Sequence, residues 1–253
     1  MLKLTQSADT YEMDHLLTYY ECDETGHPTM SMLLSMFSTV SNAHETFLGI
    51  DKQTVLSTGG AWVITGYAGS LEKELPHFGE HVVLGTRAVA YNRFFALREF
   101  WLRSVDGKIL AKAQCQFVFM DLTARKLESI PPQLIKPFHS PEMKRLPRIR
   151  RPHDLTENEP THHVNYRVRF FDIDANHHVN NARYFDWLLA PLGDDFLRQH
   201  RVKSFAIQYN HEVRPQQVVT SVFTKQENDG HLTSQHQITI DYKECTKADF
   251  EWY

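Results

Sequence analysis

The residues best suited to chemistry lie in one short segment, 172–181, which reads Asp-Ile-Asp-Ala-Asn-His-His-Val-Asn-Asn. In an extended chain the side chains alternate between two sides, so Asp174, Asn176 and His178 would converge on one point. A carboxylate, an amide and a histidine together can supply a base or nucleophile and the groups that orient it. The segment is therefore the candidate catalytic site, although these groups taken alone fit several reactions.

The start of the helix expected after this segment would add a second catalytic element. The first N–H groups of a helix have no partner within it, and the helix dipole places partial positive charge there. With Val179 and Asn180 at that N-terminus, these groups would stabilise the oxyanion formed when a carbonyl is attacked. Cleavage of a thioester needs such stabilisation.

The same residues have other uses, which stay open at this point. Asp172, Asn180 and Asn181 are favourable helix caps and turn formers, and capping is the role we expect for them. Zinc is disfavoured, because the chain has neither an HExxH motif nor Cys/His pairs at zinc spacing, so we expect no metal and no other cofactor. The absence of a GxSxG elbow argues against a nucleophilic serine. In the zinc alternative, the metal ligands would be drawn from His162, His163, His177, His178 and Asp174.

Length, composition and charge bound the class of protein. The chain has 253 residues, of which 42% are hydrophobic and 23% charged, as expected of a folded, soluble protein of two domains. A net charge of -4 argues against nucleic acid as the main partner. Cys22, Cys115 and Cys245 form no CxxC pair, which fits a reducing cytoplasm. We expect no membrane span, because no apolar run reaches about 18 residues.

The prolines divide the chain into two halves. Seven of the eleven prolines lie within 131–160, which predicts a linker. We expect an N-terminal domain over 1–138, a linker rich in proline and arginine over 139–160, and a C-terminal domain over 161–253.

Each half combines one helix with several strands. In the first half, an apolar stripe from Met30 to Val40 predicts a helix over about 30–48. In the second half, a stripe from Val179 to Leu192 predicts another. Because a helix and a sheet must each bury an apolar face, we expect the α+β class, with an antiparallel sheet wrapped around a long central helix in each half. The expected strands cover 61–67, 82–91, 95–105, 109–119, 164–170, 204–209, 218–226 and 232–240.

The two halves also echo each other locally. The stretch 20–23 precedes the first helix much as 169–172 precedes the second, and 23–27 stands where the second half has its Asp/Asn/His pattern. The first half lacks the asparagine of that pattern. We therefore expect only the second half to be catalytic.

The segment 172–181, followed by Ala-Arg-Tyr-Phe-Asp-Trp at 182–187, closely resembles the fatty acyl-acyl carrier protein thioesterases of plants and bacteria. Weaker similarity covers most of the chain, including 94–98. The resemblance implies two tandem hotdog domains, the first of which shapes the acyl-chain pocket. It also implies hydrolysis of fatty acyl-acyl carrier protein to free fatty acid and carrier protein, in fatty acid biosynthesis and without a cofactor.

By resemblance, the catalytic pattern falls on Asp174, Asn176 and His178, with a further glutamate at Glu212. The plant members commonly carry a cysteine after that glutamate, whereas this chain has Val213, which excludes a cysteine mechanism. Asp174 or Glu212 would then activate water, or Asp174 would attack the thioester directly. His178 would hold the network or protonate the departing thiolate.

The resemblance also implies a partner, an acyl carrier protein that bears the acyl chain. The linker residues Arg148, Arg150 and Arg151 are its candidate docking site, with ordinary solvation of a linker as the alternative. A homodimer is compatible with the sequence. The alternative functions are an acyl-CoA thioesterase and a non-catalytic acyl-binding protein of the same fold, with dehydratase chemistry less favoured.

Overall fold

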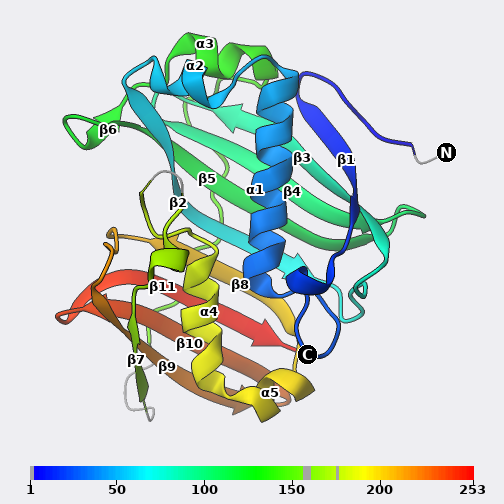
Figure 1. The fold of residues 1–253 in the computed structure, drawn as a ribbon, viewed down its shortest axis with the longest axis vertical. Coiled ribbons are helices and arrows are strands. Elements are labelled where there is room, and N and C mark those ends of the chain that lie inside the picture. The colour runs from blue at the N-terminus through cyan, green and yellow to red at the C-terminus, as the bar shows by residue number, and fades with distance from the viewer. Residues whose placement is uncertain (1–2, 156–160, 175–176) are drawn as a thin grey trace. The chain divides into compact units, whose positions relative to one another are not determined.

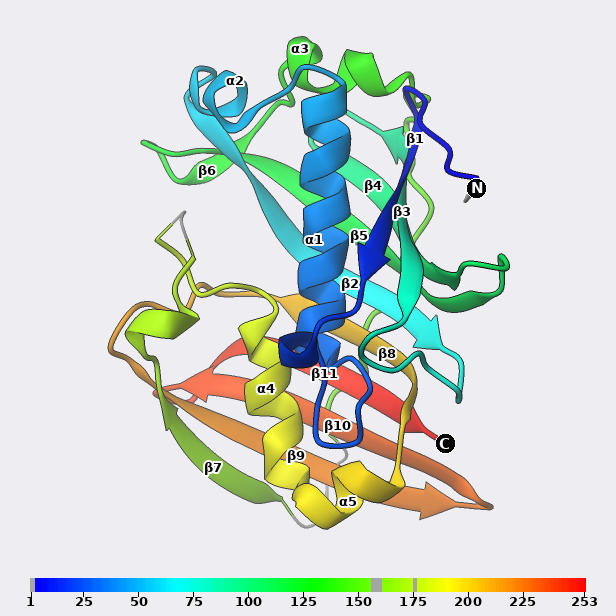
Figure 2. The same ribbon diagram turned by 45° about the vertical axis from the view of Figure 1, so that its right-hand side comes forward.

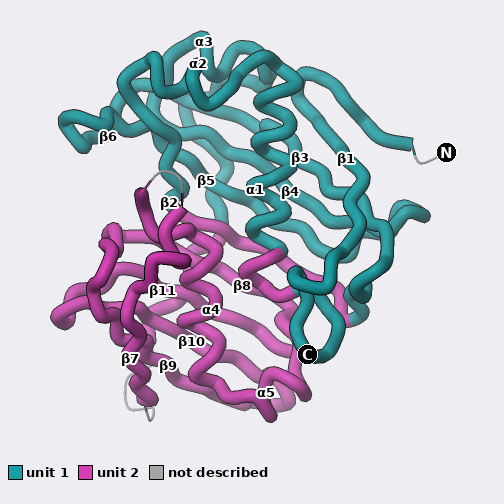
Figure 3. Tube along the Cα trace, viewed as in Figure 1, with its two compact units in different colours: residues 1–28, 33–65, 74–149 teal, residues 29–32, 66–73, 150–253 magenta. Residues whose placement is uncertain are grey.

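The computed structural model describes residues 3–155, 161–174 and 177–253. The chain folds into two compact units, coloured separately in Figure 3. Unit 1 comprises 1–28, 33–65 and 74–149, and unit 2 comprises 29–32, 66–73 and 150–253. Two short pieces of the first half of the sequence, 29–32 and 66–73, thus belong to unit 2.

Unit 1 is an antiparallel sheet with a helix across one face (Figures 1 and 2). The helix α1 (Met30–Phe47) matches the predicted helix to within a residue. Its stripe is buried, and Phe37 stacks on Phe100 of the sheet with ring centroids 5.3 Å apart. The strands, in sheet order, are β1 (Thr10–Leu16), β3 (His81–Tyr91), β4 (Phe95–Ser104), β5 (Ile109–Asp121) and β2 (Gly60–Leu71), with β6 (Lys126–Glu128) beside β5.

Short helical segments complete unit 1. They are the α-helices α2 (Lys52–Leu56) and α3 (Pro132–Ile135) and the 3-10 turns η1 (Tyr19–Glu21) and η2 (Lys136–Phe138).

Unit 2 is also an antiparallel sheet crossed by a helix, α4 (Arg183–Leu189) (Figure 1). Phe185 of α4 contacts the rings of Phe205 and Phe250 at centroid distances of 5.7 and 6.2 Å. Aromatic packing therefore holds α4 against the sheet. The strands, in sheet order after the second part of β2, are β8 (Val202–Tyr209), β11 (Lys243–Trp252), β10 (His231–Ile240), β9 (Val218–Asn228) and β7 (His162–Arg167). The remaining elements are η3 (Phe170–Asp172), η4 (Ala190–Leu192) and α5 (Asp194–Gln199).

The helix of the second half is shorter than the apolar stripe predicted. It begins at Arg183, because the residues before it are held in turns, and Asn180 Oδ1 accepts a hydrogen bond from the Ala182 N–H at 3.0 Å. It ends at Leu189, where the chain tightens into η4 around Pro191, which has no N–H to continue the helix. The apolar stripe therefore predicted the buried face of α4 correctly and overestimated the length of the helix.

Strand β11 was missing from the sequence prediction. Its charged residues obscure the alternation of apolar side chains that marks a strand. In the structure two of these charges are paired: Asp249 accepts from Arg150 Nη1 at 2.6 Å, and Lys247 donates to Asp154 at 2.6 Å. None of the described helices is long and apolar enough to cross a membrane.

Candidate functional site

The described residues of the segment 172–179 belong to a closed turn, not to an extended strand. The Asp174 N–H donates to the His178 carbonyl at 2.8 Å, and the His177 N–H donates to the Asp174 carbonyl at 3.0 Å. Ile173 and Val179 face each other in an antiparallel bridge. The expected alternation of 174, 176 and 178 along an extended chain is therefore wrong. Asp174 and His178 are instead opposite each other across the turn, and facing positions of an antiparallel pair share a side.

The turn joins two of the predicted site residues to a third on a distant loop. His178 Nε2 lies 3.1 Å from Glu212 Oε1, and Glu212 belongs to the loop between β8 and β9. The two side chains are 43% and 31% exposed, so the pair is open to solvent. The His178 N–H also approaches Asp174 Oδ1 at 3.4 Å. Asn176 lies outside the described residues.

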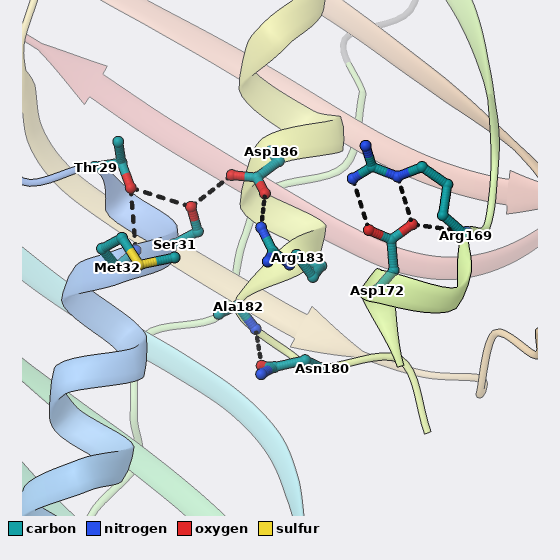
Figure 4. Close-up of polar contacts among 9 residues, drawn as sticks. All are labelled: Thr29, Ser31, Met32, Arg169, Asp172, Asn180, Ala182, Arg183 and Asp186. Atoms are coloured by element: carbon teal, nitrogen blue, oxygen red, sulfur yellow. Dashed lines mark hydrogen bonds and ion pairs between the residues drawn. The ribbon is translucent and has the colours of Figure 1, made fainter. Parts of the chain in front are cut away.

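An ion pair with a buried carboxylate holds the base of the turn (Figure 4). Asp172 is 1% exposed and accepts hydrogen bonds from the Arg169 N–H and Arg169 Nη2, both at 2.8 Å. Burial opposes its ionisation, but the hydrogen bonds from Arg169 outweigh burial and hold the pKa of Asp172 below its ordinary value. The Asp172 carbonyl accepts from the Asn180 N–H at 2.9 Å, which closes the far side.

Val179 and Asn180 do not form the helix N-terminus that the sequence predicted. Both precede α4, which begins at Arg183, and the Asn180 N–H already donates to the Asp172 carbonyl. Asn180 instead acts as a turn former, one of the alternative roles expected from the sequence, through its contact with the Ala182 N–H; the N-cap residue of α4 is Ala182. The oxyanion role of these two residues is therefore unsupported as a helix-terminal effect.

A polar cluster ties α4 to the first residues of α1 within unit 2 (Figure 4). Ser31 Oγ donates to Asp186 Oδ1 at 2.5 Å, and Arg183 Nη1 donates to Asp186 Oδ2 at 3.1 Å. Thr29 Oγ1 accepts from the Met32 N–H at 3.1 Å, as an N-capping side chain does. This cluster holds α4, which follows the turn at 174–178 in the sequence, to the start of α1. Sequence reasoning did not single out Ser31 or Asp186.

Tyr184 packs beneath the loop that carries Glu212. It is 4% exposed, and its ring lies 5.2 Å from that of Tyr209. Burial raises the pKa of the Tyr184 hydroxyl, opposed by a hydrogen bond with the Val213 backbone. Val213 is itself fully buried, so the residue after the glutamate is a packing side chain that anchors the loop. The one sequence signal for Tyr184 was its place in the stretch 182–187, which resembles the thioesterase family.

The three linker arginines are not equivalent. Arg150 pairs with Asp249 at 2.6 Å, and the neighbouring His153 N–H donates to the same carboxylate at 2.9 Å, so Arg150 pins the chain to β11. The sequence predicted that Arg150 would help dock a partner protein; in the structure its contact is with Asp249. Arg148 and Arg151 are exposed.

The rival zinc ligands are dispersed. The ring of His162 stacks on Phe223 at 4.9 Å, and His163 Nε2 contacts the Thr161 hydroxyl at 3.1 Å. Among the described residues, no group of three or more His, Cys, Asp or Glu side chains is placed to hold a metal ion.

Unit 1 contains a turn closed by equivalent backbone hydrogen bonds. The Asp23 N–H donates to the His27 carbonyl at 2.9 Å, the Gly26 N–H donates to the Asp23 carbonyl at 2.9 Å, and Cys22 bridges Pro28. Gly26 and His177 occupy the same position with positive φ, 81° and 63°. Matching these two turns aligns 19–21 with 170–172. The alignment of 20–23 with 169–172 expected from the sequence is therefore off by two residues. The echo of 23–27 with 174–178 is the correct one.

The chain is similar to thioesterases over most of its length. Residues 8–138 match the family model of the Acyl-ACP thioesterase N-terminal domain, and residues 155–253 match that of the Acyl-ACP thioesterase C-terminal domain. A solved structure assigned as an oleoyl thioesterase from Lactobacillus plantarum is 38% identical, with a TM-score of 0.92 over 96% of this chain and 95% of that one.

Two plant proteins are more distant. The structure of a 12:0-ACP thioesterase from Umbellularia californica is 20% identical and shares the fold, with a TM-score of 0.82 over 96% of this chain and 94% of that one. A chloroplastic dodecanoyl-[acyl-carrier-protein] hydrolase of Cinnamomum camphora is 26% identical over 200 residues, which are 76% of this chain. The chain spans 52% of the length of that relative.

Proposed function

Because the chain belongs to the acyl-ACP thioesterase family, in which ACP stands for acyl carrier protein, we propose that it hydrolyses fatty acyl-ACP to free fatty acid and carrier protein. The observation that carries the proposal is the 3.1 Å contact between His178 Nε2 and Glu212 Oε1 beside Asp174. A structural ion pair would gain little from being 43% and 31% exposed, since exposed pairs contribute about 0 to 1 kcal/mol. A catalytic pair has to be reachable.

The chemistry follows from what these groups can exchange. Asp174 or Glu212 takes a proton from water as the water attacks the thioester carbonyl, or Asp174 attacks the carbonyl itself and water then cleaves the anhydride. In both routes the C–S bond breaks, and His178 delivers a proton to the departing thiolate. Asn176 is assigned to orient the reacting carboxylate or water. Nothing in this scheme calls for a cofactor.

We further propose that the units are tandem hotdog domains, with 161–253 catalytic, 139–160 a linker and 1–138 shaping the acyl-chain pocket. The supporting observation is that each unit has one sheet crossed by one helix, α1 or α4. Unit 1 also has a small, partly open pocket whose lining includes Trp62, Phe117 and Phe138 together with Glu45 and Arg98. All three cysteines are free thiols, which supports a reducing compartment such as the cytoplasm.

The test is release of fatty acid from purified acyl-ACPs of short, medium and long chains, with the matching acyl-CoAs assayed in parallel. We expect release from acyl-ACP with the higher kcat/KM, and a loss of about 10²-fold in Glu212→Ala. Higher kcat/KM on the acyl-CoAs would reassign the enzyme as an acyl-CoA thioesterase. Tight binding of acyl-ACP without release would make it an acyl-binding protein and contradict the proposal.

A further inference from the structure

We propose that the carrier protein docks on a surface beside the catalytic turn, formed by Arg167, Arg169, Phe170, Phe171 and Arg214, which we call the carrier face. The inference rests on the proposed function, because it assigns the partner of that same site. It differs from the linker docking site expected from the sequence.

Two exposed phenylalanines form the apolar part of the carrier face. Phe170 and Phe171 are 86% and 79% exposed, and their rings pack edge to face at 5.6 Å. They occupy η3, which the ion pair between Arg169 and Asp172 locks in place. The catalytic turn follows η3 directly. Large apolar side chains held rigidly in solvent mark an interaction surface.

Three arginines on the neighbouring segments give the face its charge. The Arg169 side chain is 64% exposed while the Asp172 side chain is 0% exposed, so their ion pair shows solvent only its cationic end. Arg167 at the end of β7 and Arg214 are also exposed.

Backbone contacts hold these segments together. The Val168 N–H donates to the Gln217 carbonyl at 2.9 Å, and Gln217 Oε1 accepts from the Arg214 N–H at 2.6 Å. The loop that carries Arg214 also carries Glu212, which pairs with His178. The arginines therefore lie on the two segments that bound the site.

The matching turn of unit 1 acts as an internal control. Tyr19 and Tyr20 stand at the positions of Phe170 and Phe171 and are also exposed, at 72% and 90%. The positions of Arg167 and Arg169 are held by Leu16 and Thr18. Exposed aromatics thus occur in both halves, whereas these arginines occur only beside the catalytic turn.

An acidic partner that brings its thioester to this turn accounts for the difference. Acyl carrier proteins are small acidic proteins, and the acyl chain is attached through a phosphopantetheine arm that carries a further negative charge. A cationic face next to the site raises the association rate and orients the encounter, while the rings supply short-range contact. A small neutral thioester would reach the site without the face.

The test compares two double charge reversals of equal size. In Arg167→Glu/Arg214→Glu we expect the KM for acyl-ACP to rise about tenfold or more, with kcat changed less than about twofold. Activity on an acyl thioester of N-acetylcysteamine, which is neutral, should stay unchanged. The matched control, Arg148→Glu/Arg151→Glu, should leave the KM for acyl-ACP as it was. Arg169 is left in place because it holds the turn.

A binding measurement separates the face from the chemistry. The affinity for a carrier protein bearing a hydrolysis-resistant acyl amide should fall about tenfold or more in Arg167→Glu/Arg214→Glu, whether or not the enzyme turns over. Unchanged affinity, or an equal loss in the linker variant, overturns the carrier face. A wild-type dimer that Phe170→Ser/Phe171→Ser dissociates without loss of carrier binding would likewise overturn it, in favour of an interface between two copies.

Discussion

The turn at 23–27 in unit 1 and the turn at 174–178 in unit 2 are closed by equivalent backbone hydrogen bonds but differ in what their side chains contact. His178 reaches Glu212, a carboxylate on a separate loop. His27 Nδ1 lies 3.2 Å from the Pro76 carbonyl, and its ring lies 4.0 Å from that of His77. A backbone carbonyl can accept a hydrogen bond but cannot serve as a base at neutral pH.

The two aspartates differ in the same way. The Asp23 carboxylate accepts from the N–H and the hydroxyl of Thr25, at the position where unit 2 has Asn176. Asp23 thereby completes a turn of its own, a local use that threonine and aspartate commonly serve. A turn closed by these hydrogen bonds is thus present in both halves. The candidate chemistry depends on a carboxylate that arrives from another loop.

Neutralising the two aspartates gives the largest expected contrast. We expect Asp174→Asn to lower kcat on acyl-ACP by about 10³-fold, because it removes the carboxylate proposed to activate water or to attack. Asp23→Asn should change kcat by less than about twofold. Steady-state rates with a chosen acyl-ACP check both variants. A comparable loss in Asp23→Asn would show that both turns take part in catalysis.

Removing the two histidines should give a smaller contrast. His178→Ala is expected to lower kcat by about 10²-fold, since the thiolate then leaves without a positioned proton donor. Added imidazole should restore part of the lost rate. His27→Ala should keep its rate and lose about 1 kcal/mol of stability with the contact to Pro76. Failure of imidazole to restore any rate, with equal rates in the two variants, would remove His178 from the proposed mechanism.

The smallest contrast concerns stability at the base of each turn. Hydrogen bonds outweigh burial and lower the pKa of both Asp172 and Glu21. A lowered folded-state pKa adds stability above the unfolded pKa, and this is lost as the pH falls through the folded value.

Thermal unfolding checks this prediction. At neutral pH, Asp172→Asn should cost about 2 kcal/mol, because Asp172 is buried and its donor Arg169 is charged. Glu21→Gln should cost about 1 kcal/mol, because Glu21 is less buried than Asp172, although its carboxylate accepts hydrogen bonds from both Thr18 and His15. Both differences from wild type should shrink as the pH is lowered below about 4. A difference for Asp172→Asn that persists in acid would assign its effect to packing and not to ionisation.

The elements of unit 1 were largely predictable, because they follow from local periodicity. The stripe of α1 repeats with the helical period, and the strands from β3 to β5 alternate or carry clear turn residues between them. Strand β11 was not predicted from the sequence. Two of its charged residues, Asp249 and Lys247, pair with Arg150 and Asp154, which lie far away in the sequence.

The sequence selected candidate site residues, which stay a prediction, but it did not give their geometry. A dense polar stretch and a family resemblance were enough to select Asp174, Asn176, His178 and Glu212. The extended arrangement inferred for 174–178 was wrong, because hydrogen bonds between Asp174 and His178 close the chain into a turn. Alternation along a strand describes an isolated segment and takes no account of such closure.

The sequence by itself determined the class of the protein and the α1 helix and supplied the candidate reactive groups, since these depend on composition, periodicity and residue type. Tertiary structure decided which groups meet. It brought Glu212 to His178, used Arg150 to anchor β11, and placed Arg167 and Arg214 on segments that border the site. The physical reason is that contacts between distant segments depend on how sheets and loops pack, and local sequence patterns carry no information about which distant side chain will arrive.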